Sequence, residues 1–302
     1  MHQLAIVIPY FKLTFFRETL ESLASQTDQR FHVYIGNDAS LENPDELLEE
    51  FEGKFNFTYK RFDENLGGIS LTKQWERCID MMQGEEWFMI LGDDDFLGCD
   101  VVSEFYLQLL QLKIDTNIIR YSLQIIDQHS IPIRELITSP KFENSIDSHF
   151  KKLSGLTSGS LSEHIFRTRA YYKHGFKDYP LAWGSDNRAI IDISEGNDIY
   201  SINNAIVYFR LSNINISGNT NANQLIKIES LILQRRMLFK DYKNLMSASQ
   251  KNIFLNIYED DLFTKKKITR KELLEIVTWT FLFRTYSDFT RVMKIILYRL
   301  LN

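Results

Sequence analysis

Three consecutive carboxylates follow a short apolar segment about 90 residues into the chain. Asp93, Asp94 and Asp95 come after Phe88–Leu91, with only Gly92 between them. Neighbouring carboxylates repel one another unless a cation, hydrogen-bond donors or a proton offsets their charge. Carboxylate oxygens suit a hard divalent cation, and Mg²⁺ typically binds one or two of them together with substrate phosphates. The cluster therefore predicts a metal–phosphate site, with a helix cap beside solvated carboxylates as the alternative.

A phosphatase with an aspartyl nucleophile also places Asp-x-Asp after an apolar strand. That strand is usually the first of its domain, and Thr or Val commonly follows the acids. Here the cluster lies far from the start of the chain and Phe96 follows it. A phosphatase is therefore disfavoured.

Two other short segments combine polar residues with residues that favour turns. Asp38, in Asn37–Ser40, could accept a hydrogen bond from a nucleobase N–H, or could bond its own backbone in a turn. Gly67, in Asn65–Gly68, could let the backbone approach a ligand closely, or could belong to a flexible turn. Neither segment is specific by itself, and their order along the chain carries the information.

Alternating strands and helices are expected to position these segments. The strands are predicted at Leu4–Pro9, Phe31–Asp38, Phe55–Phe62 and Glu86–Leu91. Helices are predicted at Phe15–Gln26 and at Ser70–Met82, and a further helix is predicted to begin after Asn43. Asn43 would be the N-cap of that helix and Pro44 its first residue, and an acid that follows could close a capping box. This alternation predicts an α/β fold with a mostly parallel sheet between helices. Ligands of such sheets bind outside the carboxyl ends of the strands, where the strand order reverses.

Taken together, these motifs resemble the inverting nucleotide-sugar glycosyltransferases of family two, which have the GT-A (Rossmann-like) fold. The resemblance extends from Leu4 to about Ser217. It is carried by Ile-Val-Ile-Pro-Tyr at the first strand, Asn-Asp-Ala-Ser after the second, Asn-Leu-Gly-Gly before the third helix and Leu-Gly-Asp-Asp-Asp after the fourth strand. Each motif is short, and their common order indicates the family without indicating a substrate.

The resemblance implies a nucleotide site. Asp38 would bond the base, most often uracil, while Pro9 and Tyr10 would line the same pocket. Asn65 and Gly67 would lie beside the donor.

The resemblance also implies a divalent cation, Mn²⁺ or Mg²⁺, at the acidic cluster. Asp94 would be the principal metal ligand, Asp93 would contact the ribose or the water shell of the metal, and Asp95 would be a further ligand or orient the loop or the donor sugar. Many members carry an acid where this chain has Gly92, which leaves open which two carboxylates bind the metal.

Two basic residues are implied on the donor side. Lys73 would stand in for an Arg that many members place near the nucleotide. Arg210 lies in Tyr208–Ser212, a segment followed by Ile216 and Ser217 that resembles the strand and loop closing over the diphosphate; a surface ion pair is the alternative for this guanidinium.

The resemblance implies a catalytic base at Asp186. In the family the base is an acid in a loop that opens a helix, and Leu181–Arg188 fits this description with Ser185 in place of the usual Glu. Capping of the following helix is the alternative for Asp186, and Asp178 is the second candidate for the base. Gly155–Ser162 resembles the segment that meets the donor sugar and acceptor, whereas the neighbouring His164 is expected to be a packed or surface residue.

Composition indicates an ordinary globular protein of a reducing compartment. The chain has 302 residues, a net charge of −5 and two cysteines, too few for a disulfide framework. Pro9 ends the first apolar run early, no basic segment precedes that run, and no apolar stretch reaches 18 residues, so neither a leader nor a membrane span is expected. Residues 1–261 carry a net charge of −11, which argues against nucleic acid as a partner. We expect a cytoplasmic protein.

The last part of the chain has a helical apolar period from Asn223 onwards. Thr269 and Glu272 form a capping-box pattern that begins a long final helix, rich in aromatic and basic residues, and residues 262–302 carry a net charge of +6. Such a helix could lie on the inner face of a membrane through residues 265–302, or could pack against the catalytic domain or a second subunit. The predicted domains are 1–217, with a nucleotide part at 1–115 and an acceptor part at 116–217, and a helical extension at 218–302.

The resulting hypothesis is a metal-dependent inverting glycosyltransferase. It would move a sugar from a nucleotide diphosphate sugar, with a UDP-sugar favoured, to a glycan or lipid-linked saccharide. A catalytically silent binding or scaffold subunit is the alternative, because Ser185 and Lys73-Gln74 depart from the family pattern. A nucleotidyltransferase is disfavoured, because Tyr10–Thr14 is not a Gly-rich basic loop.

Overall fold

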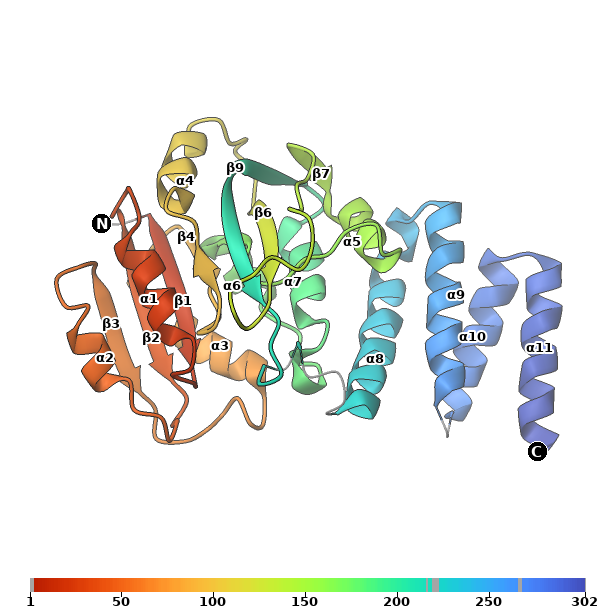
Figure 1. Cartoon of the computed structure of the whole chain (residues 1–302). Helices are drawn as coiled ribbons and strands as arrows, with labels where there is room; N and C mark the ends of the chain where they lie inside the picture. The colour runs from red at the N-terminus through yellow and green to blue at the C-terminus, as the bar shows by residue number, and fades with distance from the viewer. Residues whose placement is uncertain (1–2, 216, 219–222, 266–267, 302) are drawn as a thin grey trace. The chain divides into compact units, whose positions relative to one another are not determined.

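The computed structural model describes residues 3–215, 217–218, 223–265 and 268–301 (Figure 1). Two compact units are formed, Met1–Gln224 and Leu225–Asn302. Ile216, Lys266 and Lys267 lie outside the described residues, as do the side chains of Arg299 and Leu300.

The first half of the larger unit alternates strands and helices as the sequence predicts. Its elements are β1 (Leu4–Tyr10), α1 (Phe16–Ala24), β2 (Phe31–Asn37), α2 (Asp45–Glu49), β3 (Phe57–Arg61), α3 (Leu71–Ile79) and β4 (Trp87–Ile90). Strand β1 pairs in parallel with β2 and with β4, and β2 pairs in parallel with β3. The four strands and three helices are therefore confirmed, with ends that differ by a few residues.

One helix start differs from the prediction. Helix α2 begins at Asp45, with Pro44 rather than Asn43 at the N-cap position and without a side-chain cap. Asn43 instead accepts a hydrogen bond from the backbone N–H of Asp45 through Oδ1, at 3.2 Å, in a short turn before the helix.

The second half of this unit adds antiparallel strands. Its elements are β5 (Phe96–Leu97), α4 (Val101–Leu109), β6 (Ile118–Ile126), β7 (Phe142–Asn144), α5 (Ser145–Leu153), β8 (His164–Arg167), α6 (Thr168–His174), the short 3₁₀ helix η1 (Pro180–Ala182), α7 (Ser185–Ser194) and β9 (Asp198–Arg210). The strand order is β3-β2-β1-β4-β8-β6-β9-β5, and β7 pairs with β9. Strand β8 is antiparallel to both β4 and β6, so the whole sheet is mixed.

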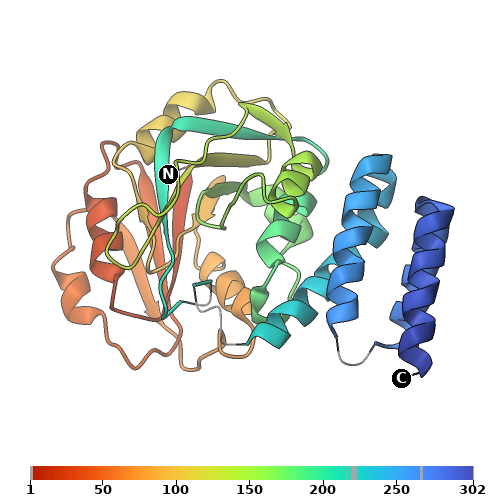
Figure 2. The same ribbon diagram turned by 45° about the vertical axis from the view of Figure 1, so that its right-hand side comes forward.

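The apolar strands supply two cores, one on each face of the sheet. Along β1, Leu4, Ile6 and Ile8 pack into one hydrophobic cluster, while Ala5 and Val7 pack into the other. This alternation follows from the two-residue repeat of a strand. Helices α1 and α4 contribute to the first core, and α3, α6 and α7 to the second, so helices cover both faces as predicted (Figure 2).

The strand order reverses between β1 and β4. From β1 the chain continues outward through β2 and β3, and it then returns to place β4 on the other side of β1. The loops that follow β1 and β4 therefore emerge side by side, which is where a parallel α/β sheet places its ligand.

The smaller unit is helical. It contains most of α8 (Gln224–Tyr242), the 3₁₀ helix η2 (Lys243–Leu245), α9 (Ala248–Thr264), α10 (Arg270–Phe283) and α11 (Tyr286–Leu301). The capping box of Thr269 and Glu272 at the start of α10 is confirmed. Within the described part of the chain, we find no helix with the length and apolar character that crossing a membrane requires.

The prediction of a single long final helix is wrong, because α10 ends at Phe283. Arg284 is extended (φ −127°, ψ 179°), and α11 begins at Tyr286. Thr285 accepts a hydrogen bond from the Asp288 N–H at 3.2 Å, and the Asp288 carboxylate accepts from the Thr285 hydroxyl at 2.7 Å. A second cap thus starts a new helix where the apolar period alone predicts continuation.

Candidate active site

The acidic cluster lies in the loop after β4 and is bonded to the loop after β1. Asp93 accepts hydrogen bonds through Oδ2 from the backbone N–H groups of Phe11, at 2.6 Å, and Lys12, at 2.8 Å. Burial and the neighbouring Asp94 carboxylate raise the pKa of Asp93 to about 7. The loops at the reversal of strand order are therefore joined through a carboxylate.

Asp94 is held by a residue that lies far from it in the sequence. Its Oδ2 accepts a hydrogen bond from Asn215 Nδ2 at 3.0 Å, in the loop that follows β9. Burial raises the pKa of Asp94, against the effects of the Asn215 hydrogen bond and the cations of Arg210 and Lys12. A Cβ atom on Gly92 would lie 2.9 Å from Asp94 Oδ1, so any other residue at this position would require the Asp94 side chain to shift.

Asp95 points inward. Its Oδ1 accepts from the backbone N–H of Arg210 at 2.8 Å, and its Oδ2 accepts from Ser162 Oγ at 2.5 Å. Burial, with Asp94 next in effect, raises the pKa of Asp95 well above its usual range. Because both oxygens already accept from protein donors, Asp95 links the loop to β9 and to the segment before β8, and the metal contact predicted for it has less support than those of its neighbours.

The donor set at this loop fits a divalent cation that is completed by a substrate. Across the described residues, no three or more His, Cys, Asp or Glu side chains converge on one point. Mg²⁺ and similar ions commonly use only one or two carboxylates when substrate phosphates supply further oxygens. Asp94 and Asp93, two crowded carboxylates with raised pKa values, match that arrangement.

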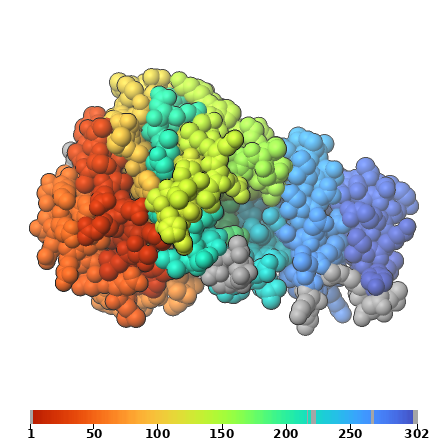
Figure 3. All heavy atoms as spheres, viewed as in Figure 1, coloured from red at the N-terminus to blue at the C-terminus, as the bar shows by residue number. Residues whose placement is uncertain are grey.

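Arg210 is buried beneath the acidic loop. Its Nε donates to the backbone carbonyl of Asp94 at 2.9 Å, its Nη1 to the carbonyl of Asp127 at 3.1 Å and to Ser130 Oγ at 3.0 Å, and its Nη2 to Glu18 Oε2 at 2.8 Å. In Figure 3 the segment that follows β6 lies against α1, where Ser130 Oγ also donates to Glu18 at 2.6 Å. Arg210 does form an ion pair, with the 44% exposed side chain of Glu18, but the arginine itself is buried and all three of its guanidinium nitrogens bond to protein groups, so it is not a surface residue.

Asp38 directly follows β2, and it organises the loop before α3. Its carboxylate accepts from the backbone N–H groups of Leu66, at 2.7 Å, and Gly67, at 2.9 Å, and from the guanidinium of Arg77. Burial raises the pKa of Asp38, opposed by these same donors. A Cβ atom on Gly67 would lie 2.5 Å from Asp38 Oδ2, so only glycine allows this approach.

The other residues predicted to bind the donor differ in how far they are buried and in what they contact. The Tyr10 ring is buried against Phe16, and its hydroxyl donates to the Glu42 carbonyl at 2.7 Å. Pro9 is half-buried within β1, Asn65 accepts from the Gly68 N–H at 2.6 Å, and Lys73 is exposed on α3. The cation that reaches the Asp38 carboxylate is Arg77, one turn after Lys73.

Asp186 lies in the first turn of α7, where a carboxylate is favoured by the helix dipole. Asn187 Nδ2 donates to its Oδ1 at 3.2 Å, and Lys152 Nζ lies 3.6 Å from its Oδ2. Ser185, which replaces the usual Glu, is buried and donates to the Lys177 carbonyl at 2.7 Å. Asp178, the second candidate for the base, is exposed and accepts from Thr72 Oγ1 at 2.8 Å.

The backbone that leads to Asp186 is strained. Leu181 and Ala182 both adopt left-handed conformations, with φ of 58° and 51°, and Gly184 follows with φ of 93°. Such conformations cost about 1–3 kcal/mol each in residues other than glycine, and they concentrate at functional sites. The strain favours a functional role for the start of α7.

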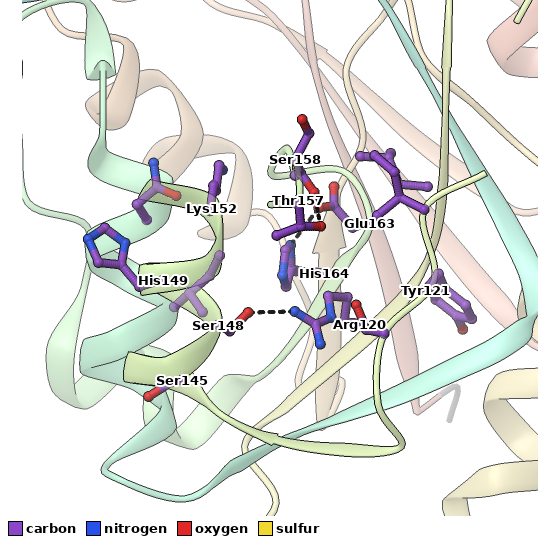
Figure 4. Close-up of a pocket in the computed structure, with 16 residues that line it drawn as sticks. Arg120, Tyr121, Ser145, Ser148, His149, Lys152, Thr157, Ser158, Glu163 and His164 are labelled. Atoms are coloured by element: carbon purple, nitrogen blue, oxygen red, sulfur yellow. Dashed lines mark hydrogen bonds and ion pairs between the residues drawn. The ribbon is translucent and has the colours of Figure 1, made fainter. Parts of the chain in front are cut away.

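A pocket lies beside Asp186, between α5, β6, β8 and the segment before β8 (Figure 4). Ser148, Lys152, Thr157, Ser158 and Asn187 are among its polar lining residues. The segment predicted to meet donor sugar and acceptor thus supplies one wall of this pocket, and through Ser162 it also contacts Asp95. The segment therefore connects the acidic loop with the surroundings of Asp186.

His164 lines the same pocket but is a packed residue, as expected. Its Nδ1 lies 3.0 Å from the Ser160 carbonyl. Burial, with the cations of Arg120 and Lys152, lowers the pKa of His164 well below its usual range. The ring is therefore neutral at physiological pH.

Comparison with known proteins decides the family. Residues 5–158, just over half of the chain, match the sequence profile described as Glycosyl transferase family 2. The chain belongs to glycosyl transferase family 2. No curated protein sequence matches it significantly.

Solved structures show that this family 2 member has the GT-A fold. It is similar to S. aureus TarS 1-349 in complex with UDP-GlcNAc, with a TM-score of 0.63 and 14% identity, over 97% of this chain and 81% of that chain. The complex of TarS 1-349 with UDP gives a TM-score of 0.60 and 13% identity, over 92% and 79% of the two chains. GalNAc-T7 with UDP, GalNAc and Mn²⁺ gives a TM-score of 0.50 and 10% identity, over 70% and 44%.

Sequence reasoning missed four residues around the site of this family 2 member. Lys12, Arg77, Lys152 and Asn215 each contact, or lie within 4 Å of, a predicted site carboxylate or its loop. Lys12 could have been found, because it lies in the loop after the first strand. The other three contact partners 34 or more residues away in sequence, and no local motif marks them.

Proposed function

We propose that this family 2 glycosyltransferase moves a sugar from a nucleotide diphosphate sugar to a hydroxyl group of a glycan or a lipid-linked saccharide, with inversion. A UDP-sugar is the favoured donor. The observation that carries the proposal is the pair of crowded carboxylates, Asp93 and Asp94, at the reversal of strand order, bonded to the loop after β1.

The donor half of the proposed site combines this acidic loop with the loop held by Asp38. Asp94, with Asp93, would hold Mn²⁺ or Mg²⁺, which supplies charge neutralisation for the departing diphosphate. Asp38 fixes the backbone N–H groups of Leu66 and Gly67, and the nucleotide would lie close to the backbone of this loop. The solved complexes of TarS with UDP and UDP-GlcNAc, and of GalNAc-T7 with UDP and Mn²⁺, support this choice of donor and cofactor.

Asp186 is the proposed base. Direct displacement at an anomeric carbon requires a group that takes the proton from the incoming hydroxyl, and such assistance contributes typically about 10²–10⁴-fold. The carboxylate of Asp186 lies in the first turn of a helix, and its neighbours Lys152 and Asn187 line a pocket that also presents hydroxyl groups. Holding that hydroxyl in line removes a further part of the barrier.

Nothing in the described residues or in the comparisons favours the catalytically silent alternative. Ser185, one of the two departures on which that alternative depended, donates to the Lys177 carbonyl and so fixes the start of α7. Contact of residues 265–302 with the inner face of a membrane, in an otherwise cytoplasmic protein, stays a prediction.

Calorimetric titration with UDP, GDP and CDP, each with and without Mn²⁺, tests the donor site. We expect UDP to bind in a metal-dependent way, and Asp94→Asn to weaken the metal-dependent binding by at least about tenfold, as loss of a metal-site group does. Asp115→Asn is the matched control, because Asp115 is an exposed aspartate in the loop before β6.

Two results would count against this site. If none of the three nucleotides binds the folded protein, the glycosyltransferase proposal fails. If Asp94→Asn keeps the full metal dependence, the ligand role moves to Asp93.

A further inference from the structure

Lys152 is the cation nearest to Asp186 among the ion pairs of the described residues. Its Nζ lies 3.6 Å from Asp186 Oδ2, and the two side chains are 28% and 20% exposed. A Cβ atom on Gly159 would lie 3.7 Å from the same Nζ, so the ammonium group stands between α7 and the loop that precedes β8. Figure 4 shows Lys152 on the α5 side of the pocket, across from Thr157 and Ser158.

The fold fixes the direction of this lysine. Helix α5 is joined to α7 through the hydroxyls of Ser145 and Ser194, 2.8 Å apart, and it buries Ile146 and Phe150. Lys151 and Lys152 both lie in its last turn, and neighbouring residues of a helix point about 100° apart. Lys151 therefore bonds to Glu143 on β7, while Lys152 reaches Asp186.

The geometry at Asp186 suits orientation of the carboxylate. Asn187 donates to Oδ1 and Lys152 lies beside Oδ2, so groups from two helices fix both ends of the carboxylate. At 3.6 Å the ammonium group attracts Oδ2 without making a short hydrogen bond, which leaves a lone pair for an incoming hydroxyl. A base must lie within hydrogen-bond reach of the proton that it takes, so its orientation affects the rate directly.

We propose that Lys152 is the positioning residue of Asp186, fixing the direction of the carboxylate through their half-buried ion pair. The inference rests on the proposed function, because it assigns to Lys152 an effect that is exerted only through the base. It predicts an effect on turnover and none on donor binding, since Lys152 has no contact with the acidic loop among the interactions described.

The test compares Lys152→Met with Lys151→Met. These two substitutions remove the same charge from adjacent positions of one helix, and only the first removes the cation beside Asp186. Turnover is measured as UDP release by hydrolysis of UDP-glucose, UDP-galactose, UDP-GlcNAc and UDP-GalNAc, with water as the acceptor of the sugar, and UDP affinity is measured by calorimetry. We expect Lys152→Met to lower kcat about tenfold with the UDP affinity unchanged, Lys151→Met to keep both, and Lys152→Arg to recover most of kcat.

A double variant separates positioning from a general structural role. Asp186→Asn should lower kcat at least about a hundredfold. Adding Lys152→Met to Asp186→Asn should cause no further loss, because a residue that acts through another shows its effect only when its partner is present. A structural role would instead lower kcat in both backgrounds.

The outcomes distinguish the inference from the function on which it rests. Equal kcat values in Lys152→Met and Lys151→Met, together with a strong loss in Asp186→Asn, would overturn the inference alone. Near-normal turnover in Asp186→Asn would overturn the base assignment and the inference with it. If UDP does not bind and none of the UDP-sugars is hydrolysed, the proposed donor class fails.

Discussion

Arg210 stabilises the acidic loop through its hydrogen bond to the backbone of Asp94. Its guanidinium bonds to the Asp94 carbonyl on one side and to Glu18 on the other, and it lies over the Phe15 ring with 4.2 Å between the guanidinium carbon and the ring centroid. A planar guanidinium offers several donors in fixed directions, which an ammonium group cannot reproduce. The sequence predicts a diphosphate contact for this arginine, whereas the contacts described favour a role in shaping the loop.

Arg210→Lys should therefore lower stability. Loss of several buried hydrogen bonds, with acceptors left unpaired, is expected to cost about 2–4 kcal/mol of the free energy of unfolding. Urea denaturation measures this, with the exposed Lys73→Ala as a control expected to change it by no more than about 0.5 kcal/mol. If Arg210→Lys instead kept full stability and weakened UDP binding, the diphosphate contact would be the better assignment.

At the scale of elements, the loop between β3 and α3 depends on one close approach. Gly67 donates its backbone N–H to Asp38, and a Cβ atom there would meet Asp38 Oδ2 at 2.5 Å. The carboxylate cannot easily retreat, because Leu66 and Arg77 also hold it. The adjacent Gly68 differs, since a Cβ there would meet only the side chain of the exposed Asn65, at 2.9 Å.

Gly67→Ala is expected to destabilise the protein by about 1–3 kcal/mol, as overpacking does, and to weaken nucleotide binding. Gly68→Ala is the matched control for stability and should leave the free energy of unfolding nearly unchanged, because the Asn65 side chain can move into solvent. Thermal unfolding and UDP calorimetry on the two variants give the comparison. Equal behaviour of the two variants would show that Asp38 does not depend on Gly67 for its place.

Elements were predictable where local signals are strong. The apolar strands β1 and β4, and the Ser70 and Thr269 caps, have sequence patterns that act within a few residues. The break between α10 and α11 was missed because the apolar period continues through it, although Thr285 and Asp288 form a capping pattern that could have been noticed. The antiparallel placement of β8 has no local signal, since it depends on pairing with β4, far away in the sequence.

The candidate site was predictable in its place and less so in its contacts. The topology of a parallel α/β sheet places the loops of Tyr10 and Asp93 together once the strands are known. The contacts that each side chain makes depend on residues far away in the sequence, as Asp95 shows by accepting hydrogen bonds from Ser162 and Arg210. No pattern in the sequence tells whether a strand-end aspartate faces a ligand or the interior.

At the scale of the whole molecule, the two units each have a core of their own. In the smaller unit, Glu259 on α9 bonds to Arg284, at the end of α10, with 2.8 Å from Nη1 to Oε2, and to Arg291 on α11, with 2.6 Å from Nη1 to Oε1. One carboxylate thus joins three helices. The same ion pairs bear on the predicted membrane contact, because they engage two of the basic residues on which that prediction rests, whereas Lys294 is exposed.

Glu259→Gln should loosen the helical unit without affecting the donor site. The substitution removes one of the two carboxylates that pair with the buried Arg284, the other being Asp288 at 2.9 Å, and loss of such a charged hydrogen bond typically costs about 1.5–3 kcal/mol. Hydrogen exchange should become faster in α9, α10 and α11, while the protection of β1 and β4 and the UDP affinity stay as in the wild type. Glu229→Gln, at an exposed position of α8, is the control. Faster exchange in both units would mean that they unfold as one, and a loss of UDP binding would mean that the donor site extends beyond the residues of the larger unit.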